Sequence, residues 1–175
     1  MVIDPEVIGY FVADISGHGI GAASFTPALK ALLRQHAGPM YSLQDTLQAI
    51  DLVMRQVLSD EQYLTACYAR LNRRARRLSI VSAGHPPAIL LRASGKTEVV
   101  TVDSEPLGVF SNLEFQYNVN PGDRLFLYTD GMIESSPGAG RREGIERLMN
   151  SVARQRGVSL DEAVAHIADG SAVRG

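Results

Sequence analysis

The sequence contains a single cysteine, Cys67, among its 175 residues. One cysteine permits no intramolecular disulfide, which excludes the small disulfide-stapled domains of secreted proteins and favours a reducing, cytoplasmic location. Cys67 lies in an apolar, alternating stretch of the chain. We therefore expect an unreactive thiol that is packed in the core.

Long hydrophobic runs and a strong charge of one sign are also missing. No apolar stretch approaches the roughly 20 residues of a membrane-spanning helix, and no basic region precedes an apolar core at the N-terminus, as it would in a secretory signal. The net charge is only −2, so we expect neither nucleic acid nor a membrane as a partner. With 45% apolar and 21% charged residues, the chain has the composition of a globular protein with a hydrophobic core.

Common catalytic motifs are absent as well. The chain has no Gly-x-Ser-x-Gly elbow, no His/Cys spacing typical of zinc sites and no phosphate-binding P-loop. Glycines at positions 17, 19 and 21 follow an apolar run, but they do not meet the Gly-x-Gly-x-x-Gly spacing. A dinucleotide site is therefore a poor second hypothesis.

The first part of the chain predicts a strand and two helices. An apolar run over residues 8–15 predicts a buried strand, and helix formers predict a helix over 20–37 that Gly38-Pro39 ends. Pro27 should kink this helix or mark its true start. Ser42 is expected to cap a second helix over 43–58, whose apolar stripe consists of Leu43, Leu47, Ile50, Met54 and Val57. This stripe is either all core or leaves some surface for a homodimer.

The middle of the chain changes to short strand-like runs separated by turn residues. The predicted strands are 64–71, 77–82, 88–92, 98–102, 114–119 and 124–129. The C-terminal part is helical again, and each of its two helices has an apolar stripe. The stripes are Ile145, Leu148 and Val152, followed by Leu160, Val164 and Ile167. Ser159 and Glu162 are expected to form a capping box. Close spacing favours antiparallel hairpins, so the predicted fold class is α+β, with helices packed on antiparallel sheet.

A carboxylate ends the first buried strand. Asp14 is followed by a glycine-rich turn that contains His18, and a predicted helix begins directly afterwards. Asp14 could hold a cation, whereas the free N–H groups at the helix start would suit a phosphate. His18 could act as a general acid, orient a bound phosphate or have a purely structural role.

Two further corners resemble the first. Asp130-Gly131 terminates an apolar strand, and carboxylates are ligands that Mg²⁺ and Mn²⁺ prefer, although Asp-Gly is also a common turn. His85 follows another apolar strand and precedes two prolines, which hold it in an extended conformation. The alternative for His85 is a rigid turn with a surface histidine.

The chain has one basic cluster, in a predicted hairpin turn. It consists of Arg73, Arg74, Arg76 and Arg77. Such a cluster is either a solvated loop or a docking patch for an acidic partner.

Taken together, these motifs resemble the SpoIIE/RsbU-type branch of the metal-dependent serine/threonine phosphatases (PPM, protein phosphatase 2C-like). They occur in the family's order across residues 8–150. The matching stretches are Ala13-Asp14-Ile15-Ser16-Gly17-His18-Gly19, Thr65-Ala66-Cys67-Tyr68-Ala69-Arg70-Leu71, Ser82-Ala83-Gly84-His85-Pro86-Pro87, Pro106-Leu107-Gly108-Val109 and Gly122-Asp123-Arg124-Leu125-Phe126-Leu127-Tyr128-Thr129-Asp130-Gly131.

The resemblance implies two packed antiparallel sheets flanked by antiparallel helix pairs. It also implies two Mn²⁺ or Mg²⁺ ions that share a water, which attacks phosphoserine or phosphothreonine. By motif, Asp14 would bridge the ions, the carbonyl of Ile15 would join one of them, and Asp130 would hold a metal. His85 would lie near the site. The expected substrate is a phosphorylated regulatory protein in bacterial signalling, typically an anti-sigma-factor antagonist of the STAS type.

The chain departs from the family pattern at both ends. The family's first strand carries a Gly-Gly-Asp-like motif and its last strand opens with an Asp-Asp pair, and neither motif is found here. We therefore expect one phosphatase domain over residues 1–175, with the first and last family strands missing. The alternative to an enzyme is a catalytically impaired module that binds regulatory partners without turnover.

Overall fold

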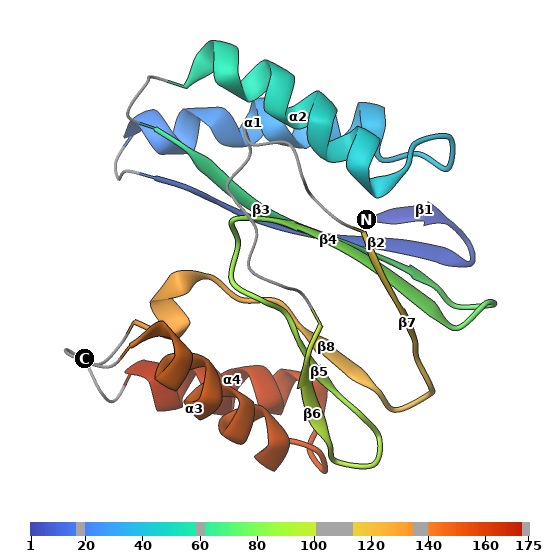
Figure 1. Cartoon of the computed structure of the whole chain (residues 1–175), viewed down its shortest axis with the longest axis vertical. Coiled ribbons are helices and arrows are strands. Elements are labelled where there is room, and N and C mark those ends of the chain that lie inside the picture. Colours follow the sequence, from blue (N-terminus) through green and yellow to red (C-terminus); the bar gives the residue numbers. More distant parts are fainter. Residues whose placement is uncertain (17–19, 59–61, 101–113, 135–139, 173–175) are drawn as a thin grey trace. The chain divides into compact units, whose positions relative to one another are not determined.

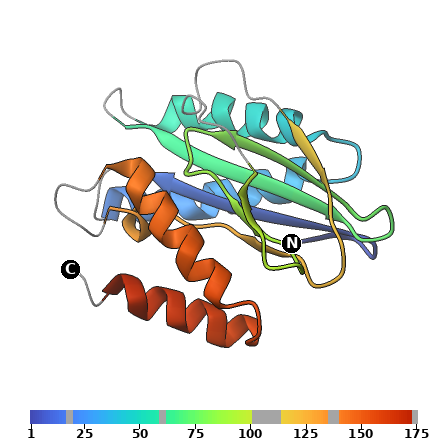
Figure 2. The ribbon, with the colours of Figure 1, turned by 60° about the horizontal axis from the view of Figure 1, so that its bottom comes forward.

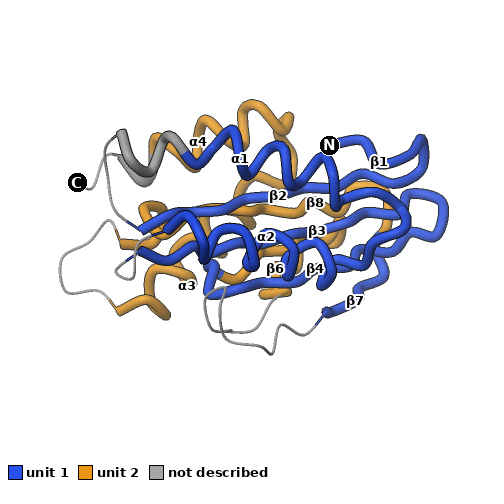
Figure 3. The backbone as a smooth tube through the Cα atoms, turned by 90° about the horizontal axis from the view of Figure 1, so that it is seen from above, with its two compact units in different colours: residues 1–86, 101–119 blue, residues 87–100, 120–175 orange. Residues whose placement is uncertain are grey.

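The structure is a computed structural model that describes residues 1–16, 20–58, 62–100, 114–134 and 140–172. The chain divides into two compact units, each built from separate segments (Figure 3). The first unit comprises residues 1–86 and 101–119, and the second comprises 87–100 and 120–175. Both units combine antiparallel strands with a pair of helices, which confirms the α+β class (Figure 1).

The first unit is a five-stranded antiparallel sheet in the order β1-β2-β3-β4-β7, with two helices over one face (Figure 1). Its strands are β1 (Val2–Asp4), β2 (Val7–Ile15), β3 (Leu64–Asn72), β4 (Arg77–Ala83) and β7 (Phe115–Asn118). Its helices are α1 (Ile20–His36) and α2 (Leu43–Val57).

Helix α2 begins where the sequence predicts. The Ser42 hydroxyl accepts a hydrogen bond from the Asp45 backbone N–H at 3.0 Å, and the Asp45 carboxylate accepts from the Ser42 N–H at 2.9 Å. This reciprocal pair satisfies two of the free N–H groups at the helix start. The predicted stripe is buried from Leu43 to Met54, whereas Val57 is half exposed.

Helix α1 runs through Pro27 and starts at Ile20, so Pro27 does not mark its beginning. Leu29, Leu32 and Leu33 pack against the core of the first unit. We attribute the tolerance of a proline inside the helix to this packing, which offsets the lost backbone hydrogen bond.

The second unit contains a three-stranded antiparallel sheet in the order β6-β5-β8. Its elements are β5 (Ile89–Leu91), β6 (Thr97–Val99), β8 (Arg124–Phe126), the 3₁₀ helix η1 (Asp130–Met132), α3 (Arg141–Arg154) and α4 (Leu160–Ala172). Helix α3 contacts β5, β6 and α4, and Figure 2 shows the two helices in orange and red. The core combines strand residues such as Ile89 with Leu148 and Val152 of α3.

Three expectations from the sequence are corrected by the structure. Strand β1 was not expected; it pairs with β2 in an antiparallel hairpin. Strand β8 ends at Phe126 rather than at residue 129, because the following residues lead into the 3₁₀ turn. In α4 the expected stripe is wrong at Leu160 and Val164, which are exposed; Ile167 is buried as expected, and Ala163 is buried as well.

The single cysteine is buried in β3, as expected. Burial in apolar surroundings raises the pKa of the Cys67 thiol to about 12, so the neutral, unreactive form prevails at physiological pH. None of the helices in the described residues has the length and apolar character needed to span a lipid bilayer.

Candidate functional site

The first acidic corner lies at the end of β2 in the first unit. Strands β2 and β3 pair in register over the whole of β2, which places Asp14 opposite Thr65 and Ile15 opposite Leu64. Asp14 is exposed and is the penultimate residue of β2. The strand itself is mostly half-buried, with only Gly9 buried, so the expectation of a fully buried strand is wrong, whereas the carboxylate does lie near the strand's end.

Backbone and side-chain hydrogen bonds hold this corner in place. The N–H of Ser16 donates to the carbonyl of Tyr63 at 2.9 Å, and the Ser16 hydroxyl accepts from the N–H of Tyr63 at 2.7 Å. These two bonds join the end of β2 to the chain just before β3. They fix the backbone next to Ile15, whose carbonyl is one of the expected metal ligands.

His85 lies in the same unit and is brought to the corner by Thr65. The Thr65 hydroxyl lies 3.1 Å from His85 Nδ1 and 3.5 Å from the carbonyl oxygen of Asp14. A hydroxyl has one proton, so Thr65 can donate to only one of these two groups at a time. The contact links the predicted first and third corners through a residue that the sequence analysis did not identify.

The surface-histidine alternative is wrong for His85, whose side chain is 2% exposed. Gly84 adopts φ 64°, a left-handed conformation that favours glycine, and it forms a parallel bridge with Ala66 of β3. The Ser82 hydroxyl donates to the His85 carbonyl at 3.2 Å. The turn after β4 therefore folds back onto β3, the central strand of the sheet, and places His85 against Thr65.

The second acidic corner lies in the other compact unit. Asp130 opens the 3₁₀ turn that follows β8, and its carbonyl accepts from the N–H groups of Ile133 and Glu134 at 2.9 and 3.0 Å. The side chain of Asp130 is partly exposed. Just before it, Tyr128 is buried in the core of the second unit and anchors the turn.

The oxygen donors at these corners are of the type that Mg²⁺ and Mn²⁺ prefer. Within the described residues, however, no group of three or more His, Cys, Asp or Glu side chains is placed to hold a metal ion. His18 and the glycines beside it, together with the motif at positions 106–109, lie outside the described residues. Asp14, Ile15 and Asp130 thus remain predicted ligands.

Thr65 is the residue that sequence reasoning missed. It belongs to a stretch that matches the family by motif, but its sequence position marks it only as the start of a strand. Its contacts with Asp14 and His85 depend on strand register and on the turn after β4, which no local pattern specifies.

Comparison with known proteins agrees with this architecture. The family description Stage II sporulation protein E (SpoIIE) matches residues 4–173. Phosphoserine phosphatase RsbP of Bacillus subtilis is 31% identical over 139 residues, which cover 75% of this chain and 34% of RsbP.

Solved structures show the same fold. The RsbU and RsbW domains of a Mycobacterium tuberculosis protein match with a TM-score of 0.77 and 27% identity, over 87% of this chain and 44% of that one. The PP2C phosphatase domain of SpoIIE from Bacillus subtilis matches with a TM-score of 0.83 and 15% identity, over 100% of this chain and 52% of that one. The chain thus spans about a third of the relative RsbP and about half of each of these structures.

Proposed function

The chain belongs to the SpoIIE family, and from this membership we propose that it acts as a metal-dependent serine/threonine phosphoprotein phosphatase. The observation that carries the proposal is the corner at the end of β2, where the Asp14 carboxylate is exposed and hydrogen bonds between Ser16 and Tyr63 hold the adjacent backbone. The name of the relative RsbP, a phosphoserine phosphatase, supports the reaction class.

In this proposal Asp14 and Asp130 hold the divalent ions through their carboxylates, and Ile15 contributes its backbone carbonyl. Two ions, Mn²⁺ or Mg²⁺, are expected in a complete site. When bound, they would supply Lewis acidity and lower the pKa of a bound water, which makes it a nucleophile toward phosphorus at neutral pH. Carboxylate and carbonyl oxygens fit such hard ions, and sulfur or imidazole ligands are not required.

The surrounding residues position these ligands. Thr65 contacts the Asp14 carbonyl and so restrains the backbone that carries both expected ligands of the first corner. His85 contacts the Thr65 hydroxyl through Nδ1. We propose that His85 holds Thr65 in position and does not itself bind a metal. His18 is proposed to act as a general acid or to orient the phosphate.

The proposed substrate is a phosphorylated regulatory protein, of the STAS-type anti-sigma-factor antagonist class. Membership of the SpoIIE family and the similarity to RsbU-type domains support a role in bacterial signalling. We also propose that a second copy of the chain pairs through the C-terminal half of α2, where Val57 is 48% and Leu52 is 64% exposed.

The second candidate is a phosphatase-like module that binds the same partners without turnover. It is favoured by the small number of carboxylates that the sequence assigns to the metal site, Asp14 and Asp130. Two carboxylates would bind divalent ions more weakly than the larger set expected in a complete site.

One experiment separates the two candidates. Phosphate release from p-nitrophenyl phosphate and from a phosphoserine peptide is measured with Mn²⁺, for the wild-type chain and for Asp14→Asn and Asp130→Asn. We expect each variant to lose activity by more than the roughly 10–100-fold that removal of an outer-shell partner costs. Asp161→Asn, which removes an exposed carboxylate from the first turn of α4, serves as the matched control and should keep wild-type activity.

Unchanged turnover in Asp14→Asn or Asp130→Asn would end the metal assignment. Binding of a regulatory phosphoprotein without any Mn²⁺-dependent phosphate release would establish the second candidate. Circular dichroism of each variant checks that the fold is kept.

A further inference from the structure

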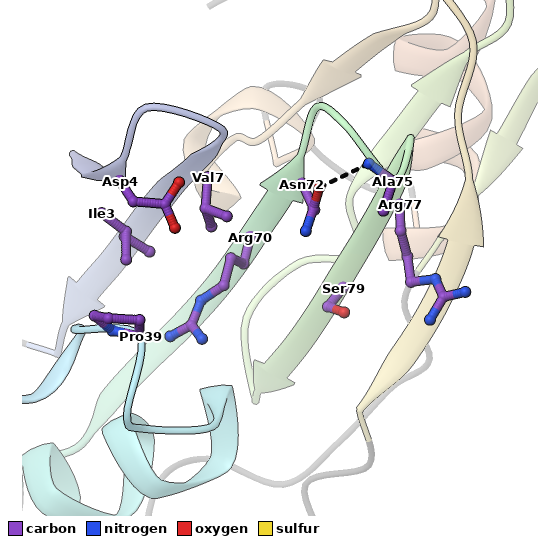
Figure 4. A pocket seen from close by; sticks show the side chains of 9 residues that line it. All are labelled: Ile3, Asp4, Val7, Pro39, Arg70, Asn72, Ala75, Arg77 and Ser79. Atoms are coloured by element: carbon purple, nitrogen blue, oxygen red, sulfur yellow. Dashed lines mark hydrogen bonds between the residues drawn. The ribbon is translucent and has the colours of Figure 1, made fainter.

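A pocket of about 270 Å³ with mixed polar and apolar walls lies in the first unit, at the end of the sheet where β3 turns into β4 (Figure 4). Its walls include Arg70, Asn72, Arg77 and Ser79, which all carry hydrogen-bond donors, and one acidic residue, Asp4. Most of the polar groups around the pocket thus favour an anion.

The pocket is remote from the proposed metal corner. Strand β2 pairs with β3 in register, with Asp14 opposite Thr65 and Val7 opposite Asn72. Because a strand rises about 3.3 Å per residue, the seven-residue separation along β2 corresponds to roughly 23 Å. Val7 and Asn72 line the pocket, so a ligand bound there would not occupy the proposed catalytic site.

Beside the pocket lies a cluster of positively charged side chains that form no ion pairs with carboxylates in the described part of the chain. The side chains of Arg73, Arg74, Arg76 and Arg77 are all exposed. Among the described residues, none of these four side chains forms an ion pair with a carboxylate. In a chain of net charge −2, a cluster of unneutralised arginines on one turn is a local feature that would attract negative charge.

Arg70 adds a partly buried guanidinium at the wall of the same pocket. Its Nη1 donates to the Tyr41 carbonyl at 2.9 Å and its Nη2 donates to the Tyr68 hydroxyl at 3.1 Å. The guanidinium also lies over the Tyr68 ring, 5.5 Å from its centroid. Its acceptors in the described part of the chain are therefore neutral, and the positive charge of Arg70 is left for a ligand.

The turn that presents the arginines is held by neighbouring strands. The Arg73 N–H donates to the Glu6 carbonyl at 2.8 Å, and the Arg76 carbonyl accepts from the Val119 N–H at 2.9 Å. The turn is thus fastened to the β1–β2 connection on one side and to the residue after β7 on the other. A fastened turn loses little conformational freedom on binding, which favours recognition.

We propose that this pocket and the β3–β4 turn form a docking site for an acidic segment of a partner protein. An Asp or Glu side chain of the segment enters the pocket beside Arg70, and flanking carboxylates contact Arg77 and the other arginines of the turn. A free small anion would use only the pocket, whereas the charged groups extend well beyond it. Nucleic acid is disfavoured by the net charge of −2 and by Asp4 in the pocket wall.

The test measures binding directly and does not depend on phosphatase activity. A fluorescein-labelled hexaglutamate peptide is titrated with the full chain at low salt, and fluorescence anisotropy gives the dissociation constant. The double variant Arg74→Gln/Arg77→Gln should bind at least about tenfold more weakly, because charge-assisted hydrogen bonds are lost. The control Arg141→Gln/Arg142→Gln removes the same charge from the first turn of α3 and should bind as the wild type does.

A gain of affinity is expected from Asp4→Asn. Figure 4 draws Asp4 on the side of the pocket away from Arg77, where its charge opposes an incoming carboxylate. The Asp4 Oδ1 accepts from the Glu6 N–H at 2.7 Å, and an asparagine oxygen can keep this bond. The variant should therefore fold normally and bind hexaglutamate more tightly.

Several outcomes would overturn the proposal. The first is that the wild type shows no measurable binding of hexaglutamate, and the second is that the two double variants weaken binding equally. The third is that inorganic phosphate, at a concentration equal to that of the peptide, displaces the peptide. The first two would show a solvated loop with diffuse attraction only, and the third would show a small-anion pocket. Tighter binding of an oligothymidine with the same dependence on Arg74 and Arg77 would assign the surface to nucleic acid.

Discussion

At the scale of single residues, the carboxylate of Asp123 accepts three hydrogen bonds within the described part of the second unit. It accepts hydrogen bonds from the backbone N–H groups of Ala93 and Asn120, at 2.8 and 3.0 Å, and from Arg92 Nη1 at 3.0 Å. Arg92 also pairs with Glu98. The Asp123 side chain is only 4% exposed, so the network fastens the turn before β8 to the end of β5 in a poorly solvated place.

This environment changes the pKa of Asp123. Burial alone would raise it, but the backbone N–H groups of Ala93 and Asn120 and the charge of Arg92 outweigh burial and lower the pKa below its ordinary value. A lowered carboxyl pKa contributes stability that is present above the unfolded-state pKa and is lost as the pH falls through the folded-state value. Acid should therefore weaken this part of the second unit below about pH 4.

Asp123→Asn should lower the free energy of unfolding by about 2 kcal/mol at pH 7, because an amide cannot accept from all three donors and leaves Arg92 less compensated. The variant has no carboxyl to protonate at this position, so the difference from the wild type should narrow as the pH falls below about 4. Urea unfolding followed by circular dichroism at several pH values measures both effects. Glu98→Gln is the matched control; Glu98 is 28% exposed, and its effect should be smaller.

A pH-independent difference between wild type and Asp123→Asn would contradict the lowered pKa. If Glu98→Gln lowered the free energy of unfolding as much as Asp123→Asn does, the stability would come from ion pairs with Arg92 and not from the hydrogen bonds that Asp123 accepts from backbone N–H groups.

At the scale of elements, helix α3 depends on one close contact. Gly144 lies in its first turns, and a Cβ atom added there would lie 2.4 Å from the Ile133 carbonyl oxygen and 2.9 Å from the Ile133 Cβ. Only glycine therefore lets α3 approach the end of the preceding 3₁₀ segment. This approach holds the chain just after Asp130, the expected ligand of the second corner.

Gly144→Ala should destabilise the protein by about 1–3 kcal/mol, because the backbone must shift to relieve overpacking. In an unobstructed helix the same change would stabilise by roughly 0.5–1 kcal/mol. Gly157→Ala, where an added Cβ meets nothing within 4 Å, is the control and should have little effect. Thermal unfolding of the three proteins measures the difference, and a Gly144→Ala variant as stable as the wild type would contradict the contact.

The sequence predicts well those elements whose start or end depends on residues that are close together in the chain. Ser42 with Asp45, and Ser159 with Glu162, form reciprocal hydrogen bonds at the starts of α2 and α4. Such caps depend on residues three apart and need no knowledge of the rest of the fold. For the same reason, the strands and hairpins between residues 64 and 99 follow from short runs of strand-forming residues and the turn residues that separate them.

What the sequence could not settle is which side of an element meets the core. In α4, Leu160 and Val164 are larger than Ala163, yet they are exposed and Ala163 is buried together with the expected Ile167. We attribute the choice of the buried face to the packing of α4 in the second unit, whose core includes Ile167. Hydrophobic size alone therefore predicted the wrong side of the helix at Leu160 and Val164.

The candidate site shows the same division. Asp14 was identified because an apolar run ends in a carboxylate, a pattern that can be read along the chain. Thr65 and the burial of His85 depend on the register between β2 and β3 and on the left-handed Gly84. These are relations between segments distant in sequence, and they become visible only in the folded structure.

At the scale of the whole molecule, each compact unit carries one of the two proposed carboxylate ligands. Asp14 belongs to the first unit and Asp130 to the second. A metal that binds the folded chain better than the unfolded chain raises the unfolding temperature by mass action. If both carboxylates bind Mn²⁺, then removing either one must reduce the stabilisation that Mn²⁺ gives to the folded chain.

We therefore expect Mn²⁺ to raise the Tm of the wild-type chain. At about 100 times its Kd, a ligand contributes about 2.7 kcal/mol, which corresponds to roughly 5–10 °C for a protein of this size. Asp14→Asn and Asp130→Asn should each lose most of this rise, whereas Asp161→Asn should keep it, and excess chelator should return the wild type to its metal-free Tm. Differential scanning fluorimetry without substrate makes the measurement independent of turnover. If Mn²⁺ raised the Tm of Asp14→Asn and Asp130→Asn as much as that of the wild type, the ion would bind elsewhere in the protein and neither carboxylate would be its ligand.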